Sequence, residues 1–221
     1  MLLLAVLTLL VACSGGGDEP APSPERALAS AKQKLDATSG VRIGLSTEQL
    51  PRGVSGLLAA DGVGTHAPAF QGTIKVSASG VTADADVVAV DGEVYAKLPF
   101  TSKFAPIDPD DYGAPDPATL LDEEGGLSSL LTAATEVQTG DRVRRGSTVL
   151  RTYTAKVPGT AVASVIPSAD PKAAFAAIFT LTDADRLDTA VLSGPFYPEG
   201  DDVTYDITFR DYGTTKTVKA P

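Results

Sequence analysis

Residues 87–98 read VVAVDGEVYAKL and contain the clearest hairpin signal of the chain. Two runs rich in Val, Tyr and Ala flank Asp91-Gly92. An Asp-Gly pair between such runs is a strong short-range signal for a two-residue turn between antiparallel strands. The stretch therefore predicts a β-hairpin, and further antiparallel strands are expected on both sides of it.

The same alternation continues on the N-terminal side of this hairpin. Val41, Ile43 and Leu45 alternate with more polar residues, which is typical of a half-buried strand. Further two-residue turns are expected at Asp61-Gly62 and at Ser79-Gly80. Residues 41–98 are therefore expected to form an antiparallel meander.

Strands resume in the second half of the chain. Residues 142–157 predict a hairpin that turns at Arg145-Gly146-Ser147, and residues 175–191 predict one that turns at Asp183-Ala184-Asp185. Residues 203–209 alternate most regularly, with apolar side chains at every second position. Together with the meander, these segments predict about nine to eleven antiparallel strands.

Two helices are expected at the borders of these strand regions, and the second is short. Ser23 as N-cap and Pro24 at the first helical position start one helix, which Gly40 is expected to close. Residues 160–166 carry apolar side chains at helical spacing and precede Pro167, so they predict another.

The middle of the chain differs in composition. Residues 99–117 contain five prolines, which predict an irregular but ordered connection. Asp116 and Pro117 then start a leucine-rich helical segment, which Gly125-Gly126 is expected to break or kink.

These elements predict an α+β fold: one long antiparallel sheet with only three helical segments. An open sheet of this size curls, and its apolar face must be covered. If the helices leave a gap, a hydrophobic cavity results. The same side chains would serve equally well as ordinary core. The residues expected to line this space are Ile43, Leu45, Val76, Val88, Leu120, Leu127, Leu131, Phe179 and Ile207.

The N-terminus has the pattern of a bacterial lipoprotein signal. The apolar run of residues 2–12 ends in Leu-Val-Ala-Cys13, and it is too short for a membrane-spanning helix, which needs ~20 residues. Residues 1–12 therefore predict a signal peptide, residues 13–24 a lipidated Cys13 with a flexible tether, and residues 25–221 a single domain. The alternative is a buried cysteine on an apolar N-terminal element. No Lys or Arg precedes the run, so we expect the true translation start to lie upstream.

Composition argues against several function classes. The net charge of −10 disfavours nucleic acid and anionic headgroups as electrostatic partners. With one His and one Cys in the chain, no zinc site, metal or cofactor is expected. His66 is interpreted as a loop residue, and residues 108–119 resemble an EF-hand opening but have Thr119 where calcium needs Glu. A carboxylate pair of the glycosidase type stays open, but nothing selects one among 28 acidic residues, and we expect no enzyme.

Several segments, in this order, resemble the actinobacterial LppX/LprA/LprF/LprG lipoprotein family. The resemblance runs from about residue 25 to 221, and no single motif is specific alone. The segments are Ala96–Phe100, Asp111–Pro117, Gly126–Leu131, Val157–Gly159 with Val165–Pro167, Leu192–Pro198 and Phe209–Gly213.

This resemblance implies a curved antiparallel sheet, or half-barrel, with a few helices packed on its concave side. The hydrophobic cavity between them takes the acyl chains of envelope lipids and glycolipids. It also implies lipid movement from the inner membrane toward the outer envelope, in one branch beside a membrane transporter. The chain is then expected to be a monomer, anchored at the outer face of the cytoplasmic membrane. The alternative is a tethered interaction module with a closed core, which docks a transporter, sensor kinase or cell-wall enzyme without carrying lipid.

Overall fold

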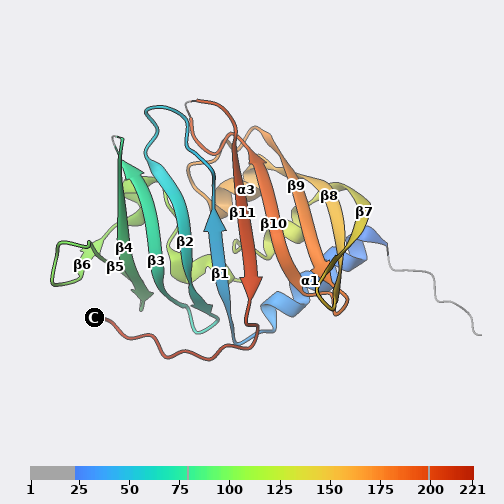
Figure 1. Cartoon of the computed structure of the whole chain (residues 1–221), viewed down its shortest axis with the longest axis horizontal. Helices are drawn as coiled ribbons and strands as arrows, with labels where there is room; N and C mark the ends of the chain where they lie inside the picture. Colours follow the sequence, from blue (N-terminus) through green and yellow to red (C-terminus); the bar gives the residue numbers. More distant parts are fainter. Residues whose placement is uncertain (1–22, 79, 199) are drawn as a thin grey trace, which may run out of the picture.

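One antiparallel sheet of eleven strands dominates the computed structural model, which describes residues 23–78, 80–198 and 200–221 (Figure 1). The strand order is β6-β5-β4-β3-β2-β1-β11-β10-β9-β8-β7, so the first and last strands meet at the centre. The sheet is not closed, and β6 and β7 form its two edges. The strands are β1 (Gly40–Ser46), β2 (Gly56–Thr65), β3 (Ala69–Ala78), β4 (Val81–Val90), β5 (Glu93–Lys97), β6 (Ala105–Ile107), β7 (Thr135–Arg145), β8 (Thr148–Pro158), β9 (Ala174–Thr182), β10 (Leu187–Gly194) and β11 (Val203–Arg210).

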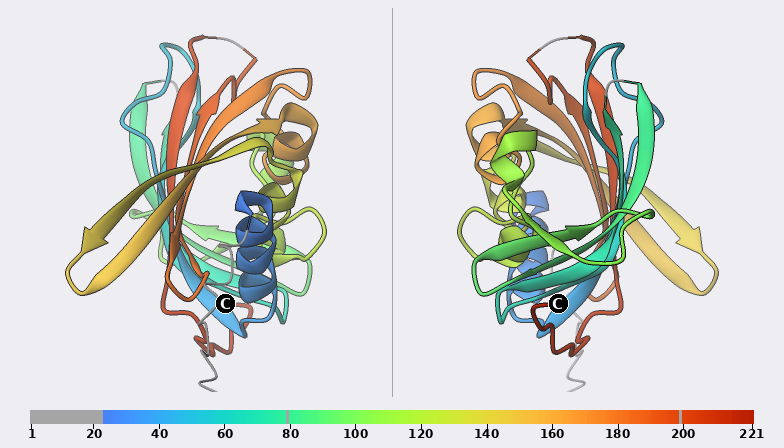
Figure 2. Two further views of the ribbon diagram at one scale, coloured as in Figure 1. Left: turned by 90° about the vertical axis from the view of Figure 1, so that its right-hand side faces the viewer. Right: turned by 90° about the vertical axis from the view of Figure 1, so that its left-hand side faces the viewer.

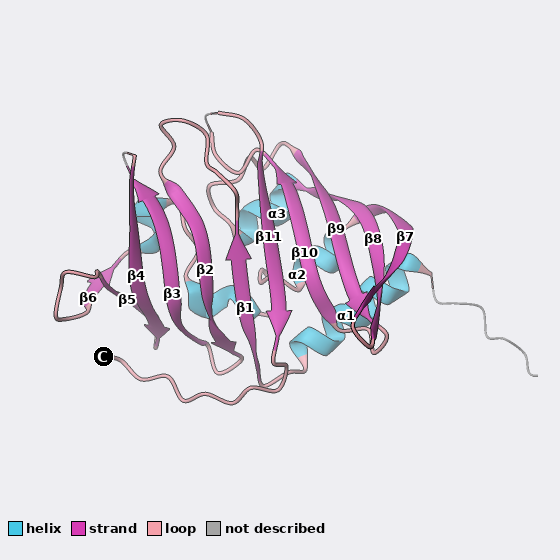
Figure 3. Cartoon of the chain, viewed as in Figure 1, coloured by secondary structure: helices cyan, strands magenta, loops and turns pink. Residues whose placement is uncertain are grey.

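Helices form a small part of the described chain (Figure 3). They all fall in the segments where the sequence predicted helix or irregular structure. They are α1 (Pro24–Asp36), η1 (Pro109–Tyr112), η2 (Pro117–Leu121), α2 (Ser129–Ala133) and α3 (Gly159–Val165), where η denotes a 3-10 helix.

The start of α1 is confirmed, but its predicted end is wrong. The Ser23 side chain accepts a hydrogen bond from the Arg26 backbone N–H, and Pro24 opens the helix. The helix stops at Asp36, because Gly40 already belongs to β1 and pairs with Thr65 of β2.

The predicted middle helix is shorter than expected. Asp116 caps it as predicted, by accepting a hydrogen bond from the Ala118 backbone N–H at 2.8 Å. The segment forms only the 3-10 helix η2, and helical structure resumes in α2 after a turn in which Gly125 has a φ of 84°. The connection before it contains β6, whose Pro106 is tolerated because the strand lies at the sheet edge.

One of the two Asp-Gly turns is confirmed and the other is wrong. Asp91 and Gly92 have φ values of 57° and 77° and join β4 to β5, as a type I′ turn requires. Asp61 and Gly62 lie inside β2. A Cβ at Gly62 would meet the Phe70 ring at 2.3 Å, so this glycine makes room for an aromatic side chain instead of forming a turn.

The sheet bends, and α1, α2 and α3 lie on the same side of it (Figure 2). We call this side the helix face; it carries Ile43, Phe179 and Ile207. The helices α1, α2 and α3 contact strands β7–β10, whereas η2 contacts β2, β3 and β4. On the helix face, α1–α3 therefore cover one half of the sheet and η2 covers part of the other half.

Candidate functional site

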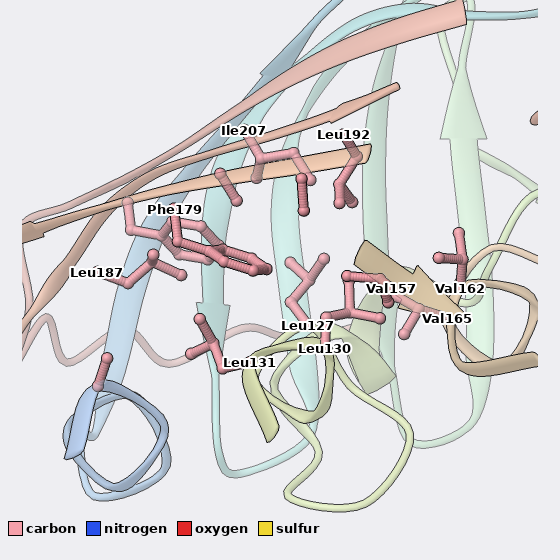
Figure 4. Packing of buried hydrophobic residues seen from close by; sticks show 14 of the residues in the cluster. Leu127, Leu130, Leu131, Val157, Val162, Val165, Phe179, Leu187, Leu192 and Ile207 are labelled. Atoms are coloured by element: carbon pink, nitrogen blue, oxygen red, sulfur yellow. The ribbon is translucent and has the colours of Figure 1, made fainter. Parts of the chain in front are cut away.

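The helix face is packed closed over β8–β11. Figure 4 shows Phe179, Leu192 and Ile207 pointing from the strands toward Leu127, Leu130 and Leu131. Phe179 and Ile207 are each 1% exposed and Leu131 is 2% exposed. Side chains fill the space under α1, α2 and α3, so this region is the main hydrophobic core.

A second, smaller cluster lies under η2 on the other half of the same face. Ala118 of η2 packs with Phe70, Val87, Ala89 and Val94 of β3, β4 and β5. The Phe70 ring lies over Gly62 and Gly72, because a Cβ on either glycine would approach the ring within 3 Å. Gly62 and Gly72 lie side by side between Ile43 and Val87, and the Phe70 ring fills the space that these two glycines leave.

Beyond this ring, the helix face of β1–β4 carries half-buried apolar side chains. In register, Leu45 lies beside Ala60, which lies beside Ile74; in the next row Leu57 pairs with Val76, which pairs with Ala83. All six are of intermediate exposure, unlike the buried residues of the two clusters. We call these residues the apolar platform: Leu45, Leu57, Ala60, Ile74, Val76 and Ala83.

The opposite face of the same strands is charged. Arg42 pairs with Asp61, Lys75 with Asp84 at 3.8 Å and Lys97 with Asp86 at 3.1 Å, each across neighbouring strands. These ion pairs are exposed and contribute little to stability, but they mark the side that faces water. Half of the sheet is therefore amphipathic, with its apolar side only partly covered.

Two tyrosines border the platform at the β11 side. The Tyr205 hydroxyl donates to the Leu57 carbonyl at 2.7 Å and lies 2.7 Å from the Tyr197 hydroxyl. The Phe196 ring packs edge-on against Tyr205 at 4.9 Å and against Phe175 at the same distance. These contacts tie the start of β2 to β11, beyond the end of β1.

The structure brings only part of the predicted lining set to the platform. Leu45 and Val76 belong to it, Leu120 is half-buried at the margin of the main core, and Ile43 lies in that core next to Gly64. Four predicted lining residues lie well inside the main core: Leu127, Leu131, Phe179 and Ile207.

Val88 lies on the other face of the sheet. It packs with Ala69, Val90, Phe104 and Val218. The prediction took Val88 from a run of four apolar residues, 87–90, in which alternation cannot distinguish the two faces. The residues packed over it, Phe104 and Val218, lie outside the neighbouring strands, so no local pattern predicts its burial.

Leu57, Ala60, Ile74 and Ala83 are platform residues that the sequence reading missed. Ile74 and Val76 do alternate with Lys75 and Ser77, a signal that could have identified this end of β3. The β2 partners are harder to recognise, because a register shift between Leu57 and Ala59 interrupts the period-two pattern.

Two shallow hollows in the described part of the chain lie away from the platform. One, of about 400 Å³, lies between the end of α1 and Tyr212; the other, of about 550 Å³, lies on the charged face around Arg42, Gln71 and Lys216. Across residues 23–78, 80–198 and 200–221, no cluster of His, Cys, Asp or Glu could hold a metal ion. Within the same ranges, no helix is both long enough and apolar enough to cross a membrane.

Stability is expected to fall at alkaline pH because of two buried tyrosines. Burial raises the pKa of Tyr205, helped by Tyr197, and burial is also the main reason why the pKa of Tyr212 is raised. The unfolded chain releases both protons above pH ~10, whereas the folded chain retains them, so the free energy of unfolding decreases there by up to ~1.4 kcal/mol per pH unit and tyrosine.

Urea unfolding between pH 9 and 11 measures this slope. Tyr205→Phe and Tyr212→Phe should each reduce it, whereas Tyr112→Phe, a matched change at an exposed position, should leave it unaltered. Equal slopes in all three variants would contradict the assignment.

The comparisons with known proteins place the chain in a defined group. The sequence profile of the LppX_LprAFG lipoprotein family matches residues 23–218. The crystal structure of LprF from Mycobacterium bovis is similar with a TM-score of 0.73 and 15% identity, covering 91% of this chain and 98% of that one. The crystal structure of the lipoprotein LppX from Mycobacterium tuberculosis has a TM-score of 0.64 and 13% identity, covering 90% and 100%. No curated protein sequence matches the chain.

Proposed function

The chain belongs to the LppX_LprAFG lipoprotein family, and from this premise we propose that it carries an envelope lipid or glycolipid by its acyl chains. The lipid is taken up at the inner membrane and passed toward the outer envelope. The observation that carries this proposal is the apolar platform on the helix face of β1–β4. The role is that of a carrier, with no chemical step on the lipid.

The platform is suited to acyl chains because it is apolar, extended and only partly covered. Leu57, Val76 and Ala83 form one row, and the row of Leu45, Ala60 and Ile74 runs beside it. Each methylene group buried there contributes ~0.8 kcal/mol, so about ten of them would offset much of the cost of withdrawing a lipid from its bilayer.

The proposed cavity lies between the concave side of the sheet and its helical cover. The bend of the sheet around the helices in Figure 2 supports this location. We place its wall at the platform, with Ile43 and Leu120 at its margin, since side chains fill the region under α1–α3. The remaining predicted lining residues of the helix face then support the wall from the core.

Membrane attachment is proposed through Cys13, which lies outside the described residues together with the predicted signal peptide. The cysteine would carry diacylglyceryl and palmitoyl groups and hold the protein at the outer face of the cytoplasmic membrane. Residues 14–24 span at most ~36–40 Å when extended, which is too short to cross a wide envelope. Lipid uptake at the inner membrane is favoured over long-range shuttling.

A transfer assay tests the carrier role. Donor vesicles hold a labelled glycolipid with two acyl chains, acceptor vesicles hold none, and the full chain carrying Cys13→Ser is added. A carrier increases the transfer rate in proportion to protein concentration. No increase at any concentration would overturn the proposal and favour the docking module. The closed packing over β8–β11 is what such a module would have.

A further inference from the structure

The outer hairpin β7–β8 is basic on an otherwise acidic chain. Residues 140–151 contain four arginines and one aspartate, although the whole chain has a net charge of −10. All residues from Gln138 to Thr148 are exposed, and β7 is an edge of the sheet. The hairpin projects from the body of the sheet in Figure 2. Its arginines are therefore presented to the surroundings on a projecting edge of the sheet.

Three of these arginines lie on one face. Arg142 is the register partner of Arg151, and Arg144 is two residues along β7 on the same side. Arg151 is also the partner of Leu181, a residue of the main core, so the three arginines occupy helix-face positions of the strand register. Arg145 belongs to the other face, where its guanidinium binds Asp188 at 2.7 Å.

The three arginines have no acidic partner within the part of the chain that the structure describes. Every ion pair there involves other basic residues, and the Nε of Arg151 is buried without a hydrogen bond. Like charges directly opposite each other on neighbouring strands destabilise a sheet. The Arg142–Arg151 pair therefore costs stability unless an anion lies between the guanidinium groups.

The position of the hairpin indicates that the membrane surface is the source of such anions. Helix α1 contacts β7, and in Figure 1 the first turn of α1 lies at the β7 end of the sheet. The ten residues between Cys13 and α1 reach at most ~33–36 Å, so an anchor at Cys13 keeps this end near the bilayer. This step rests on the proposed anchor, but not on the carrier role.

We propose that Arg142, Arg144 and Arg151 form a docking site for the phosphate groups of anionic phospholipids at the surface of the anchoring membrane. Guanidinium groups bind phosphate oxygens through paired, charge-assisted hydrogen bonds. The distant acidic residues weaken this attraction little, because charges farther apart than ~8 Å are largely screened at physiological ionic strength. The overall negative charge of the chain therefore does not prevent the β7 end of the sheet from binding anionic lipid.

Vesicle co-sedimentation tests the proposal with the chain from residue 14 onward, so that neither a lipid anchor nor the apolar residues 2–12 contribute. Vesicles of phosphatidylcholine with 30% phosphatidylglycerol are compared with vesicles of phosphatidylcholine alone. The protein should bind the anionic vesicles only, and less tightly as salt increases. Arg142→Gln with Arg144→Gln should weaken binding by ~25-fold, since each arginine near an anionic surface contributes about fivefold.

The control variant, Arg52→Gln with Lys172→Gln, removes the same charge at exposed positions elsewhere and should bind like the parent protein. Equal binding to both vesicle types, no binding, or equal loss in the two double variants would overturn the docking site. Acyl lipid extracted from the same preparations reports the carrier role independently, so failure of one proposal is distinguishable from failure of the other.

Discussion

Replacing Phe179 by alanine is expected to lower the free energy of unfolding by about 3–5 kcal/mol. The ring is 1% exposed and lies between Tyr153 and Ala190, its register partners on β8 and β10. Strands hold both sides of the site, so the surrounding structure cannot collapse to fill the space. The value is measured by urea unfolding of the full chain, with an unchanged m-value as the check that the unfolded state is the same.

Ile178→Ala is the matched control on the same strand. Ile178 is 42% exposed on the opposite face, so its truncation should change the free energy of unfolding by less than ~1 kcal/mol. A cost below ~1 kcal/mol for Phe179→Ala would show that the space around this ring is open, and the cavity would then lie under α1–α3 instead of over the platform.

Replacing Val76 by glutamate is expected to reduce bound acyl lipid at least tenfold. Val76 is half-buried at the centre of its platform row, between Leu57 and Ala83. A carboxylate there places a charge against methylene groups, and losing two buried methylene contacts alone removes ~1.6 kcal/mol of binding. Extracted lipid per mole of protein measures the effect, and urea unfolding verifies that the protein is folded.

Thr73→Glu introduces the same charge on the same strand but on the exposed charged face, and it should leave lipid content unchanged. Leu45→Trp provides a second variant that fills volume without adding charge and should also block loading. If Val76→Glu and Thr73→Glu carry the same lipid as the parent, the platform does not contact the ligand.

Local sequence predicts the strands and most of their turns because these depend on neighbouring residues. Asp91 and Gly92 form a turn because the runs beside them pair with each other. Asp61-Gly62 has the same two residues, but a ring from another strand, that of Phe70, occupies the space over its glycine. The difference between the two sites is tertiary, and so the sequence alone could not distinguish them.

The site was harder to predict than the fold for the same reason. Alternation assigns a residue to a face, as for Leu45 and Val76, but it does not tell whether a helix covers that face. Phe179 and Val76 follow the same strand pattern, yet one lies in the closed core under the helices and the other in an open row. Which half of the face is filled depends on where η2 and α1–α3 pack, and this is decided by long-range contacts.

Mass spectrometry of lipid extracted from the protein tests the central claim most directly. The full chain carrying Cys13→Ser is expressed in an actinobacterial host, purified without detergent and extracted with organic solvent. The account predicts an acyl lipid at close to one mole per mole of protein, and a clear decrease in the Val76→Glu variant. Protein that is folded and free of acyl lipid would contradict it.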